Sequence, residues 1–421
     1  MSEFQTSPGM RDILVPDSAR VRAVVDAFAA AAEGAGYELI VTPLLEDAGV
    51  FERVGEATEV VEKQMYRFTD LGGRDVALRP EFTAAIGRAF VQHRPPTPWK
   101  VWTSGSNFRY ERPQRGRYRQ FEQVDAEVLG SDDPLVDVEM IALGWRFLAA
   151  LGLRQVTLLL NSLGELAERA AYVDALRQHF GAHAATLSEA SVATLARNPL
   201  RVLDSKRPED QELIAAAPSI EQFYGPASAA HLDVVRDGLD LLGIPYTVAP
   251  RLVRGLDYYV RTTFEYAGGT LDSAQNALGG GGRYDGLVEA LGGPSTPGIG
   301  LAIGVDRTLL ACDDEGVFAA PASVVDVFVV DTTGGAAALT ICDDVRSAGL
   351  RADRAFDHRS MKSQMKAADR SGAAIAVIVG SDEAAAGTAV MRSLHDGGAQ
   401  RVVARADLVS HLTAELKAPR R

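Results

Sequence analysis

The residues most able to do chemistry in this chain are arginines concentrated in one short segment. Between Asn107 and Gln123 the sequence NFRYERPQRGRYRQFEQ carries two glutamates, Glu111 and Glu122, and five arginines: Arg109, Arg112, Arg115, Arg117 and Arg119. Arginines buried without partners would be very costly, so they cannot all face a core. A guanidinium binds phosphate in a bidentate way and stays charged, which suits stabilising charge on a phosphoryl group. The segment predicts an anion site, with a solvated basic loop as the alternative.

The elements that position these arginines form a predicted hairpin. PWKVWTSGSNFRYE and RQFEQVDAEVLG have the composition of strands, and the Arg/Gly-rich turn RPQRGRY separates them. Alternation along the first strand places Arg109 and Glu111 on one sheet face, so Arg109 can point at a ligand held there.

The first three quarters of the chain favour an antiparallel sheet of the α+β class. Strands pair locally through hairpins, and helices are segregated between them. An amphipathic helix is predicted over 16–36, with Asp17 or Ser18 as its cap. The polar, helix-rich stretch of about 166–228 is interpreted as an inserted helical module. Further elements are expected as a strand at YELIVTP, a helix over 134–150, a strand at RQVTLLLN, strands from Ile244 to Gly269 and a helix through Leu309.

The tail has a different pattern. After a joint at 313–322, strand-like and helix-like segments alternate, which predicts a separate three-layer α/β domain of roughly 100 residues. We therefore expect one domain over 1–317 and a second domain over 322–421.

Composition sets the class of protein. The chain has 421 residues, 47% hydrophobic and 24% charged, which fits two or three globular domains. No stretch approaches the ~20 apolar residues of a membrane span, and the N-terminus shows no secretion signal. Cys312 and Cys342 are far apart, which favours a reducing, cytoplasmic compartment and predicts no metal site. The net charge of -13 does not exclude nucleic acid, because phosphate contacts depend on local patches.

Three other strings each have an ordinary explanation on their own. RGLDYYVRTTFEY, from Arg254 to Tyr266, could be a packed strand with polar edges, since aromatic residues favour strands. LGGGGRYDGL contains a glycine run, which permits close backbone approach to a ligand but is common in turns. In LRPEFTA, Glu81 could be a surface carboxylate or the partner of an ammonium group.

Together these strings resemble a known family over nearly the whole chain. FRYERPQRGRYRQFEQ resembles motif 2 of the class II aminoacyl-tRNA synthetases, and GIGLAIGVDR resembles their motif 3. RGLDYY and GGGGRYDGL resemble the two signatures of the histidyl-tRNA synthetases. LRPEFTA is similar to the family loop LRPEGTA, and SPGMRDILVP, the end of motif 1 at Pro43 and the tail also match.

The resemblance implies site residues. Arg109 and Arg254 would act in catalysis, at the α-phosphate and between the α-phosphate and the histidine carboxylate. ATP would be held by Arg109, Arg117, Phe121 and Arg307. Histidine would be held by Glu81, Thr83, Gln123, Glu127, Tyr259 and Tyr284. The tRNA acceptor end would meet Arg112, Gln114 and Arg119. Three departures are Phe82 in place of a common glycine, and Tyr110 and Glu122 in place of histidines.

The function implied is that of a cytoplasmic histidine–tRNA ligase. It would activate L-histidine with ATP and Mg²⁺ and transfer it to tRNA(His), as a homodimer with a helical insertion near the acceptor stem and an anticodon-binding tail. The alternative is a catalytically silent, synthetase-like regulatory subunit of ATP phosphoribosyltransferase. Such paralogues usually lose the signature arginine and the tail, whereas Arg254 and residues 322–421 are present. A class IIa synthetase for proline or threonine does not fit RGLDYY and GGGGRYDGL.

Overall fold

The computed structural model describes residues 4–55, 60–252, 258–271, 276–321, 325–357, 359–395 and 399–417. The chain divides into two compact units, Met1–Ala320 and Pro321–Arg421. Each unit has its own hydrophobic core.

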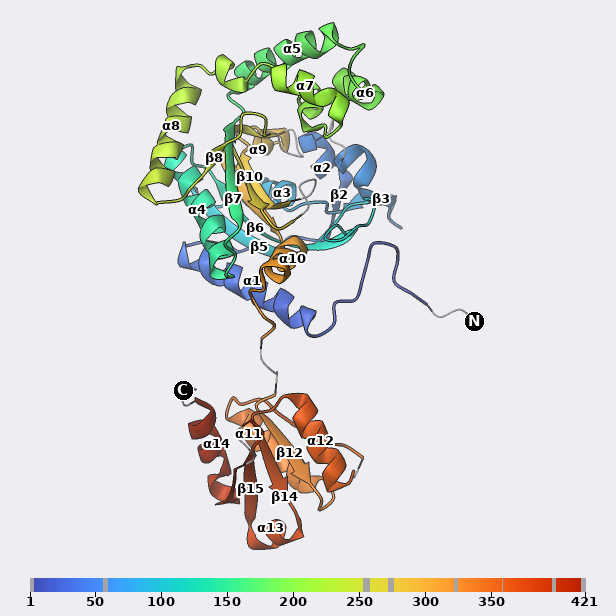
Figure 1. Cartoon of the computed structure of the whole chain (residues 1–421), viewed down its shortest axis with the longest axis vertical. Coiled ribbons are helices and arrows are strands. Elements are labelled where there is room, and N and C mark those ends of the chain that lie inside the picture. Colours follow the sequence, from blue (N-terminus) through green and yellow to red (C-terminus); the bar gives the residue numbers. More distant parts are fainter. Residues whose placement is uncertain are drawn as a thin grey trace. The chain divides into compact units, whose positions relative to one another are not determined.

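An eight-stranded sheet forms the centre of the first unit (Figure 1). Its strands are, in spatial order, β1 (Glu38–Leu39), β5 (Trp99–Phe108), β6 (Gln120–Leu129), β11 (Gly298–Gly304), β10 (Ala277–Arg283), β9 (Val260–Gly268), β7 (Val156–Ser162) and β8 (Thr247–Val248). Neighbouring strands from β5 to β7 run antiparallel, and only the edge strands β1 and β8 pair in parallel. The predicted antiparallel α+β sheet and its β5–β6 hairpin are confirmed.

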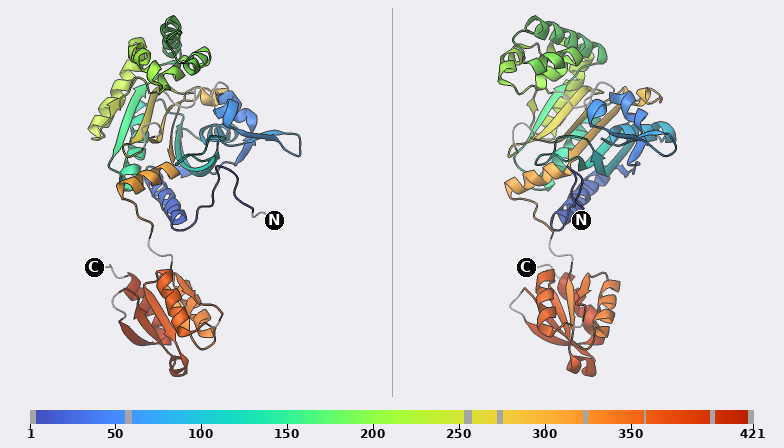
Figure 2. Two further views of the ribbon diagram at one scale, coloured as in Figure 1. Left: turned by 45° about the vertical axis from the view of Figure 1, so that its right-hand side comes forward. Right: turned by 90° about the vertical axis from the view of Figure 1, so that its right-hand side faces the viewer.

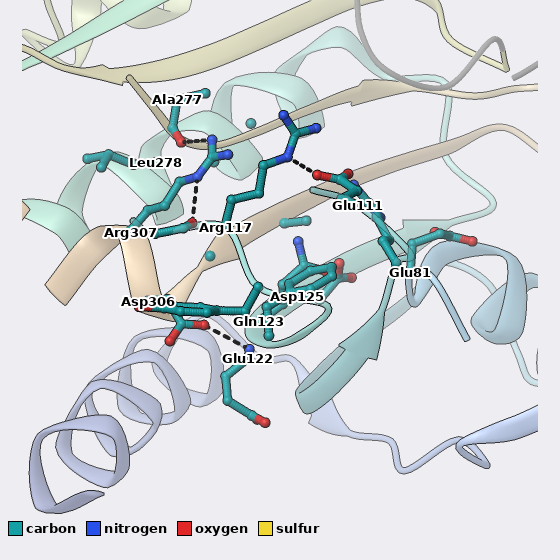
Figure 3. A pocket seen from close by; sticks show the side chains of 18 of the residues that line it. Glu81, Glu111, Arg117, Glu122, Gln123, Asp125, Ala277, Leu278, Asp306 and Arg307 are labelled. Carbon is teal, nitrogen blue, oxygen red and sulfur yellow. Dashed lines mark hydrogen bonds and ion pairs between the residues drawn. The ribbon is translucent and has the colours of Figure 1, made fainter. Parts of the chain in front are cut away.

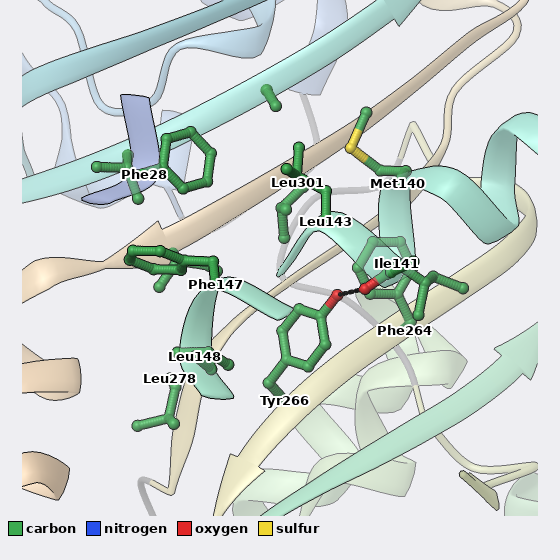
Figure 4. Close-up of a cluster of buried hydrophobic side chains, with 14 of the residues drawn as sticks. Phe28, Met140, Ile141, Leu143, Phe147, Leu148, Phe264, Tyr266, Leu278 and Leu301 are labelled. Carbon is green, nitrogen blue, oxygen red and sulfur yellow. Dashed lines mark hydrogen bonds between the residues drawn. The ribbon is translucent and has the colours of Figure 1, made fainter. Parts of the chain in front are cut away.

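Helices cover one face of this sheet and build the main core. They are α1 (Asp17–Gly34), α4 (Pro134–Ala150), α8 (Pro226–Leu241) and α10 (Val305–Glu315). Figure 4 shows Phe28 of α1 and Phe147 of α4 packed among aliphatic side chains, with the Tyr266 hydroxyl donating to the Ile141 carbonyl at 2.7 Å. The helix predicted over 134–150 is confirmed.

The predicted cap of α1 is wrong. Pro16 precedes the helix with a helical backbone conformation, and no side chain caps this end. The Ser18 N–H is already bonded to the Leu14 carbonyl at 2.9 Å, so a turn before the helix replaces a side-chain cap.

Alternation along β6 separates the core from the other face of the sheet. Val124, Ala126 and Val128 belong to the main core. Because successive side chains of a strand point to opposite faces, Gln123 and Glu127 project away from that core. This second face has room for polar groups.

A smaller layer lies beside the central sheet. It contains a three-stranded antiparallel sheet and short helices, in which α2 contacts α3 and α3 contacts α9. These elements are β2 (Leu45–Asp47), β4 (Asp75–Leu78), β3 (Tyr66–Thr69), α2 (Ala48–Gly55), the π-helix η1 (Val60–Gln64), α3 (Thr83–His93) and α9 (Leu287–Ala290).

The helical module between β7 and α8 has a separate small core that includes Tyr172, Leu176 and Phe180. In Figure 1 and in both views of Figure 2 it lies at the end of the unit opposite α1. Its elements are α5 (Leu166–Ala182), α6 (Glu189–Arg197), the 3-10 helix η2 (Pro199–Asp204), α7 (Pro208–Ala216) and the 3-10 helix η3 (Ile220–Phe223). The Tyr224 hydroxyl donates to the Ser162 carbonyl at 2.6 Å, which ties the end of the module to its beginning.

The second unit is a three-layer α/β structure. Its sheet has the order β13 (Ala352–Arg354), β12 (Val327–Asp331), β14 (Ile375–Val379), β15 (Thr388–Ser393) and β16 (Gln400–Ala404). The first three strands are parallel, and the last two add an antiparallel edge. Two apolar clusters, one on each face, include residues of α11 (Ala336–Ser347) and α14 (Leu408–Lys417) and of α12 (Met361–Ser371). The remaining elements are α13 (Ser381–Ala386) and the 3-10 helix η4 (Arg405–Asp407).

Candidate active site

A cavity of about 240 Å³ opens on the face of the eight-stranded sheet that faces away from the main core. Its walls come from the β5–β6 loop, from the segment between β4 and α3, from the residues before β9, and from the start of α10 (Figure 3). Segments far apart in the sequence thus form one site. Of the site residues predicted from the sequence, the cavity is lined by Arg109, Arg117, Phe121, Arg307, Glu81, Thr83, Gln123 and Tyr259.

The floor of the cavity is open because the neighbouring strand carries no large side chains there. Gly300 of β11 pairs with Glu127 of β6, and Gly304 pairs with Gln123. A Cβ atom at Gly300 would overlap the Glu127 carboxylate. The glycine run at 279–282 lies in β10 and not in a turn, and a Cβ atom at Gly279 would meet the Ala302 carbonyl oxygen at 2.5 Å.

Arginines supply positive charge to the cavity wall. The Arg307 side chain donates to the carbonyls of Gly116 at 3.2 Å and Ala277 at 3.0 Å. Arg117 forms an ion pair with Glu111, and Arg117 and Arg307 reach into the same part of the cavity (Figure 3). Burial and the nearby charge of Arg109 lower the pKa of Arg307. An anion in this region would offset the mutual repulsion of these cations.

Arg109 reaches the cavity by a route that differs from the predicted one. The strand β5 ends at Phe108, so alternation along a strand does not place Arg109 and Glu111. Instead, the Arg109 N–H donates to the Arg119 carbonyl at 2.9 Å, and its Nε donates to the Pro80 carbonyl at 2.9 Å. Its guanidinium lies 5.3 Å from the centre of the Phe121 ring. Both Arg109 and Glu111 still line the cavity.

The segment before α3 contributes a carboxylate to the cavity. The Glu81 carboxylate accepts hydrogen bonds from the backbone N–H groups of Thr83 at 2.7 Å and Ala84 at 2.8 Å. It therefore sits at the N-terminus of a helix, where negative charge is favoured. Phe82, which departs from the family pattern, is fully buried under the Arg79 guanidinium, 4.2 Å from its ring centre. It points away from the ligand space, since it does not line the cavity.

Glu127 lies just beneath the cavity and is fully buried. One of its oxygens accepts the Thr83 hydroxyl at 2.6 Å, and the other accepts the Tyr284 hydroxyl. The rings of Tyr284 and Tyr258 are 5.7 Å apart, and those of Tyr258 and Tyr259 are 4.6 Å apart. Two hydroxyls therefore fix both oxygens of Glu127 inside an aromatic wall.

The buried carboxyl groups around this wall resist ionisation. Burial raises the pKa of Glu81, although backbone hydrogen bonds and Arg109 oppose the shift. Burial raises the pKa of Glu127 to about 8, and burial together with Glu127 and Glu81 raises the pKa of Asp125. A cationic ligand would favour the ionised forms of all three. This part of the cavity is suited to a positively charged molecule.

Of the three residues predicted to contact tRNA, two are exposed to solvent and one packs against the protein. Arg112 and Gln114 are exposed on the β5–β6 loop, where Gln114 pairs with Arg117. Arg119 instead packs against Tyr110, with its guanidinium 3.7 Å from the ring centre, and its N–H donates to the Gly9 carbonyl at 2.8 Å.

The sequence interpretation assigned no role to several polar residues that line the cavity. Asp125 and Tyr258 line the cavity, as does Asp306 at the start of α10. Asp306 accepts from Arg11 at 2.5 Å and from the Glu122 N–H at 3.2 Å. Asp125 could have been predicted from the sequence, because residues 123, 125 and 127 of one strand face the same side of the sheet. Tyr258 and Asp306 have no such signal beyond adjacency to a predicted residue.

Some expectations concern other parts of the chain. Arg254, predicted to be catalytic, lies outside the described residues. Within the ranges that the structure describes, no group of three or more His, Cys, Asp or Glu side chains is arranged to hold a metal ion. Among the helices of those same ranges, none combines the length and the apolar composition needed to cross a membrane.

Comparison with known proteins gives matches over nearly the full length. Residues 9–308 match the family model described as histidyl-tRNA synthetase, and residues 325–415 match the one described as an anticodon binding domain. The histidine–tRNA ligase of Rhodococcus erythropolis is 46% identical, with 95% of this chain and 96% of that protein covered. The histidine–tRNA ligase of Nocardia farcinica is 45% identical, with 99% of each covered.

Solved structures agree with these matches. The apo histidyl-tRNA synthetase of S. aureus has a TM-score of 0.81 at 34% identity, covering 97% of this chain and 100% of that one. A structure described as an ATP phosphoribosyltransferase regulatory subunit/histidyl-tRNA synthetase from Bacillus halodurans has a TM-score of 0.64 at 22% identity, covering 86% of this chain and 97% of that one. The second likeness shows a shared fold alone.

Proposed function

The chain belongs to the histidyl-tRNA synthetase family, and we propose that the cavity on the open face of its eight-stranded sheet is where histidine and ATP react. As an aminoacyl-tRNA ligase it uses ATP to activate L-histidine to histidyl-adenylate, and it transfers the histidine to the 3′ end of tRNA(His). One observation carries the assignment of the site: arginines and buried carboxyl groups line the same cavity. Anionic phosphates and the ammonium group of an amino acid therefore both find partners there.

The arginines form the nucleotide side of the proposed site. Arg109 and Arg254 contact the α-phosphate, Arg117 contacts the nucleotide, and Arg307 contacts the adenine and the γ-phosphate. Phe121 supports the adenine, consistent with its place under Arg109. Guanidinium groups held in advance by carbonyl oxygens need little rearrangement when charge develops on phosphorus.

The carboxyl groups form the histidine side of the proposed site. Glu81, Thr83 and Gln123 bind the α-ammonium group, and Glu127, Tyr259 and Tyr284 bind the imidazole ring. A ring N–H needs an acceptor, and Glu127 is held ready by the hydroxyls of Thr83 and Tyr284. An amino acid without such a donor would leave the buried carboxylate without its ligand partner, so it would be rejected.

The proposed reaction is an in-line attack of the histidine carboxylate oxygen on the α-phosphorus of ATP. A new O–P bond forms, pyrophosphate leaves, and Arg109 stabilises the charge on the equatorial oxygens. Mg²⁺ bound with ATP would neutralise part of the phosphate charge. The carboxylates Glu111 and Asp306 in the cavity wall already pair with Arg117 and Arg11, so the phosphate oxygens would supply most ligands of such an ion.

The other parts of the chain have proposed roles in tRNA recognition. Arg112 and Gln114 on the exposed loop contact the acceptor end, and Arg119 supports that loop through Tyr110. The helical module of about 166–228 lies near the acceptor stem, and residues 322–421 bind the anticodon. The match of residues 325–415 to an anticodon binding domain supports the last assignment.

A homodimer in the cytoplasm is the proposed working form. Leu39, Val41, Leu44 and Leu45 follow one another around β1 and β2 and are exposed. A cluster of exposed apolar side chains is typical of a surface that another chain covers. This cluster surrounds Pro43, at the end of the segment that resembles motif 1. The cytoplasm is where protein synthesis consumes charged tRNA.

The test is ATP–pyrophosphate exchange with each of the twenty amino acids, using the purified full chain without tRNA. Exchange with histidine alone is expected, and Arg109→Ala or Arg254→Ala is expected to slow it by about 100-fold or more. Unchanged exchange in these variants would refute their roles. Histidine binding without exchange in the unmodified chain would instead support the regulatory-subunit alternative.

A further inference from the structure

Asp125 and Glu127 are two carboxyl groups that are buried next to each other in the central sheet. They lie two residues apart on β6, so they face the same side of the sheet. Asp125 is 1% exposed and Glu127 is fully buried. Their partners on β11, Ala302 and Gly300, offer no polar side chain. Nothing in the family resemblance assigns a role to Asp125.

The hydrogen bonds of the pair are incomplete. Both Glu127 oxygens accept hydroxyl groups, from Thr83 and Tyr284. In the described part of the chain, Oδ1 of Asp125 is buried without any hydrogen-bond partner. Among the same residues, neither carboxyl group forms an ion pair within 4.0 Å. A buried charge normally has such a partner, so two ionised groups here would be very unfavourable.

Among the described residues, the groups around the pair do not supply the missing positive charge. Glu81 is a third acid facing the pair, and the Arg79 charge that acts on Asp125 is held by the Thr42 carbonyl at 2.9 Å and the Ser106 carbonyl at 3.0 Å. Burial raises the pKa of Glu81, and the positive charge of Arg109 opposes that shift. In the described part of the chain, the other titratable side chains beside the pair are the phenols of Tyr258, Tyr259 and Tyr284.

We propose that Asp125 and Glu127 share one proton and together receive the histidine side chain, so that histidine binding expels this proton into the solvent. In the empty site the carboxyl of Asp125 holds the proton beside the carboxylate of Glu127, which lies two residues away on the same face of β6. Two carboxyl groups in one site cannot both ionise easily, and they titrate as a unit. The inference rests on the proposed histidine site.

The bound amino acid changes this balance. Its ammonium group adds positive charge beside the acids, and its ring N–H needs an acceptor, so both favour the ionised pair. The O–H bond of Asp125 breaks, its proton passes to the buffer, and both carboxylates become acceptors. Asp125 thereby sets the charge of the amino-acid pocket. Because the complex holds fewer protons than the free protein, affinity for histidine rises with pH in this range.

Proton release can be measured directly by titration calorimetry of the full chain with L-histidine. The heat is compared at about pH 8 in two buffers of different ionisation enthalpy, such as Tris and phosphate, because burial raises the pKa of Glu127 to about 8. The unmodified chain is expected to release a substantial fraction of one proton. Its affinity is expected to rise by up to about tenfold per pH unit between about pH 7 and pH 8.

The deciding variant is Asp125→Asn, which keeps the shape and a donor toward Glu127 but carries no removable proton. It is expected to bind histidine with proton release near zero and a flatter pH profile. Glu122→Gln is the matched control, since it removes another half-buried acid of β6, one that bonds to Ser106, and it is expected to keep the proton release. Asp125→Gly replaces the asparagine variant if that variant does not fold.

The outcomes separate the two proposals. Absence of histidine binding by the unmodified chain would refute the histidine site itself. Histidine binding without proton release, or equal release from the unmodified chain and Asp125→Asn, would overturn the shared proton while leaving the site intact.

Discussion

Replacing Arg283 by methionine is expected to lower the free energy of unfolding of the first unit strongly. Arg283 ends β10 and is fully buried. Its side chain donates to the Asp137 carboxylate at 2.5, 3.0 and 3.2 Å, and to the carbonyls of Ser131 at 2.9 Å and Asp133 at 3.1 Å. Methionine fills much of the same space but donates no hydrogen bond.

The magnitude follows from what remains after the substitution. Asp137 is also fully buried, and within the described residues it would keep only His231 as a side-chain ion-pair partner, at 2.8 Å. Removing one member of a buried pair costs about 3–5 kcal/mol, because the other charge stays buried. Against the opposing effect of burial, His231 and Arg283 lower the pKa of Asp137. A lowered carboxyl pKa contributes stability above the unfolded pKa of about 3.9 and loses it at lower pH. Without the guanidinium, burial would raise the pKa of Asp137 in the variant, so protonation would relieve the unpaired charge, and the loss of stability should shrink as the pH falls from about 7 toward about 4.

Tryptophan fluorescence during urea unfolding measures this effect on the first unit alone. The chain has three tryptophans, Trp99, Trp102 and Trp145, and all of them lie in that unit. Trp145 belongs to α4, the helix that also carries Asp137. The free energy of unfolding is compared at about pH 7 and about pH 4 for the unmodified chain and for Arg283→Met.

Arg22→Met is the matched control. Arg22 pairs with Asp26 at 2.7 Å on the exposed face of α1, and such pairs contribute less than about 1 kcal/mol. If Arg283→Met cost no more than Arg22→Met, the assignment of a stabilising role to the buried pair would be refuted. A large loss that did not change with pH would contradict the role of the Asp137 charge.

Three further predictions concern the cavity and the thiols. Gly300→Ala should lower kcat/KM for histidine by about 100-fold, because its Cβ would displace the Glu127 carboxylate, and unchanged exchange kinetics would contradict the geometry. Thr83→Val should lower kcat/KM for histidine by roughly tenfold or more by removing the hydroxyl that donates to Glu127, and a loss confined to the KM for ATP would argue against this. Burial raises the pKa of Cys312 to about 11 and also that of Cys342, so at about pH 8 both thiols should react with a disulfide reagent only after unfolding. Rapid reaction of either thiol in the folded chain would contradict their burial.

Local sequence patterns predicted the individual helices and strands, but they did not predict which strands lie next to each other in the sheet. The β5–β6 hairpin and the helix α4 follow from periodicity and turn residues within each segment. The pairing of β11 with β6 could not be predicted, because these two strands are far apart in sequence. The glycine run at 279–282 illustrates the difficulty, since its composition is equally typical of turns and its need for glycine arises from contact with β11.

The site was predictable as a set of residue types but not as a hydrogen-bond network. The cavity brings Arg109, Glu81 and Tyr259 together, as the family resemblance implies, whereas the catalytic role of Arg109 and the histidine-binding roles of Glu81 and Tyr259 stay predictions. The burial of Arg283 against Asp137 was not visible, because the two residues are 146 positions apart. The shared environment of Asp125 and Glu127 also depends on the small residues opposite them on β11.

The attachment of the helical module has a consequence for how this chain can change over evolutionary time. The segment from Leu166 to Phe223 leaves β7 and returns at a point where Tyr224 is hydrogen-bonded to Ser162. Its core is separate from the core beneath the sheet. An insertion or loss of this whole segment would need only one short splice between neighbouring points, with the strand register left intact. Lineages could therefore lengthen, exchange or discard the module in single genetic events, while the residues of the cavity continued to evolve by point substitution.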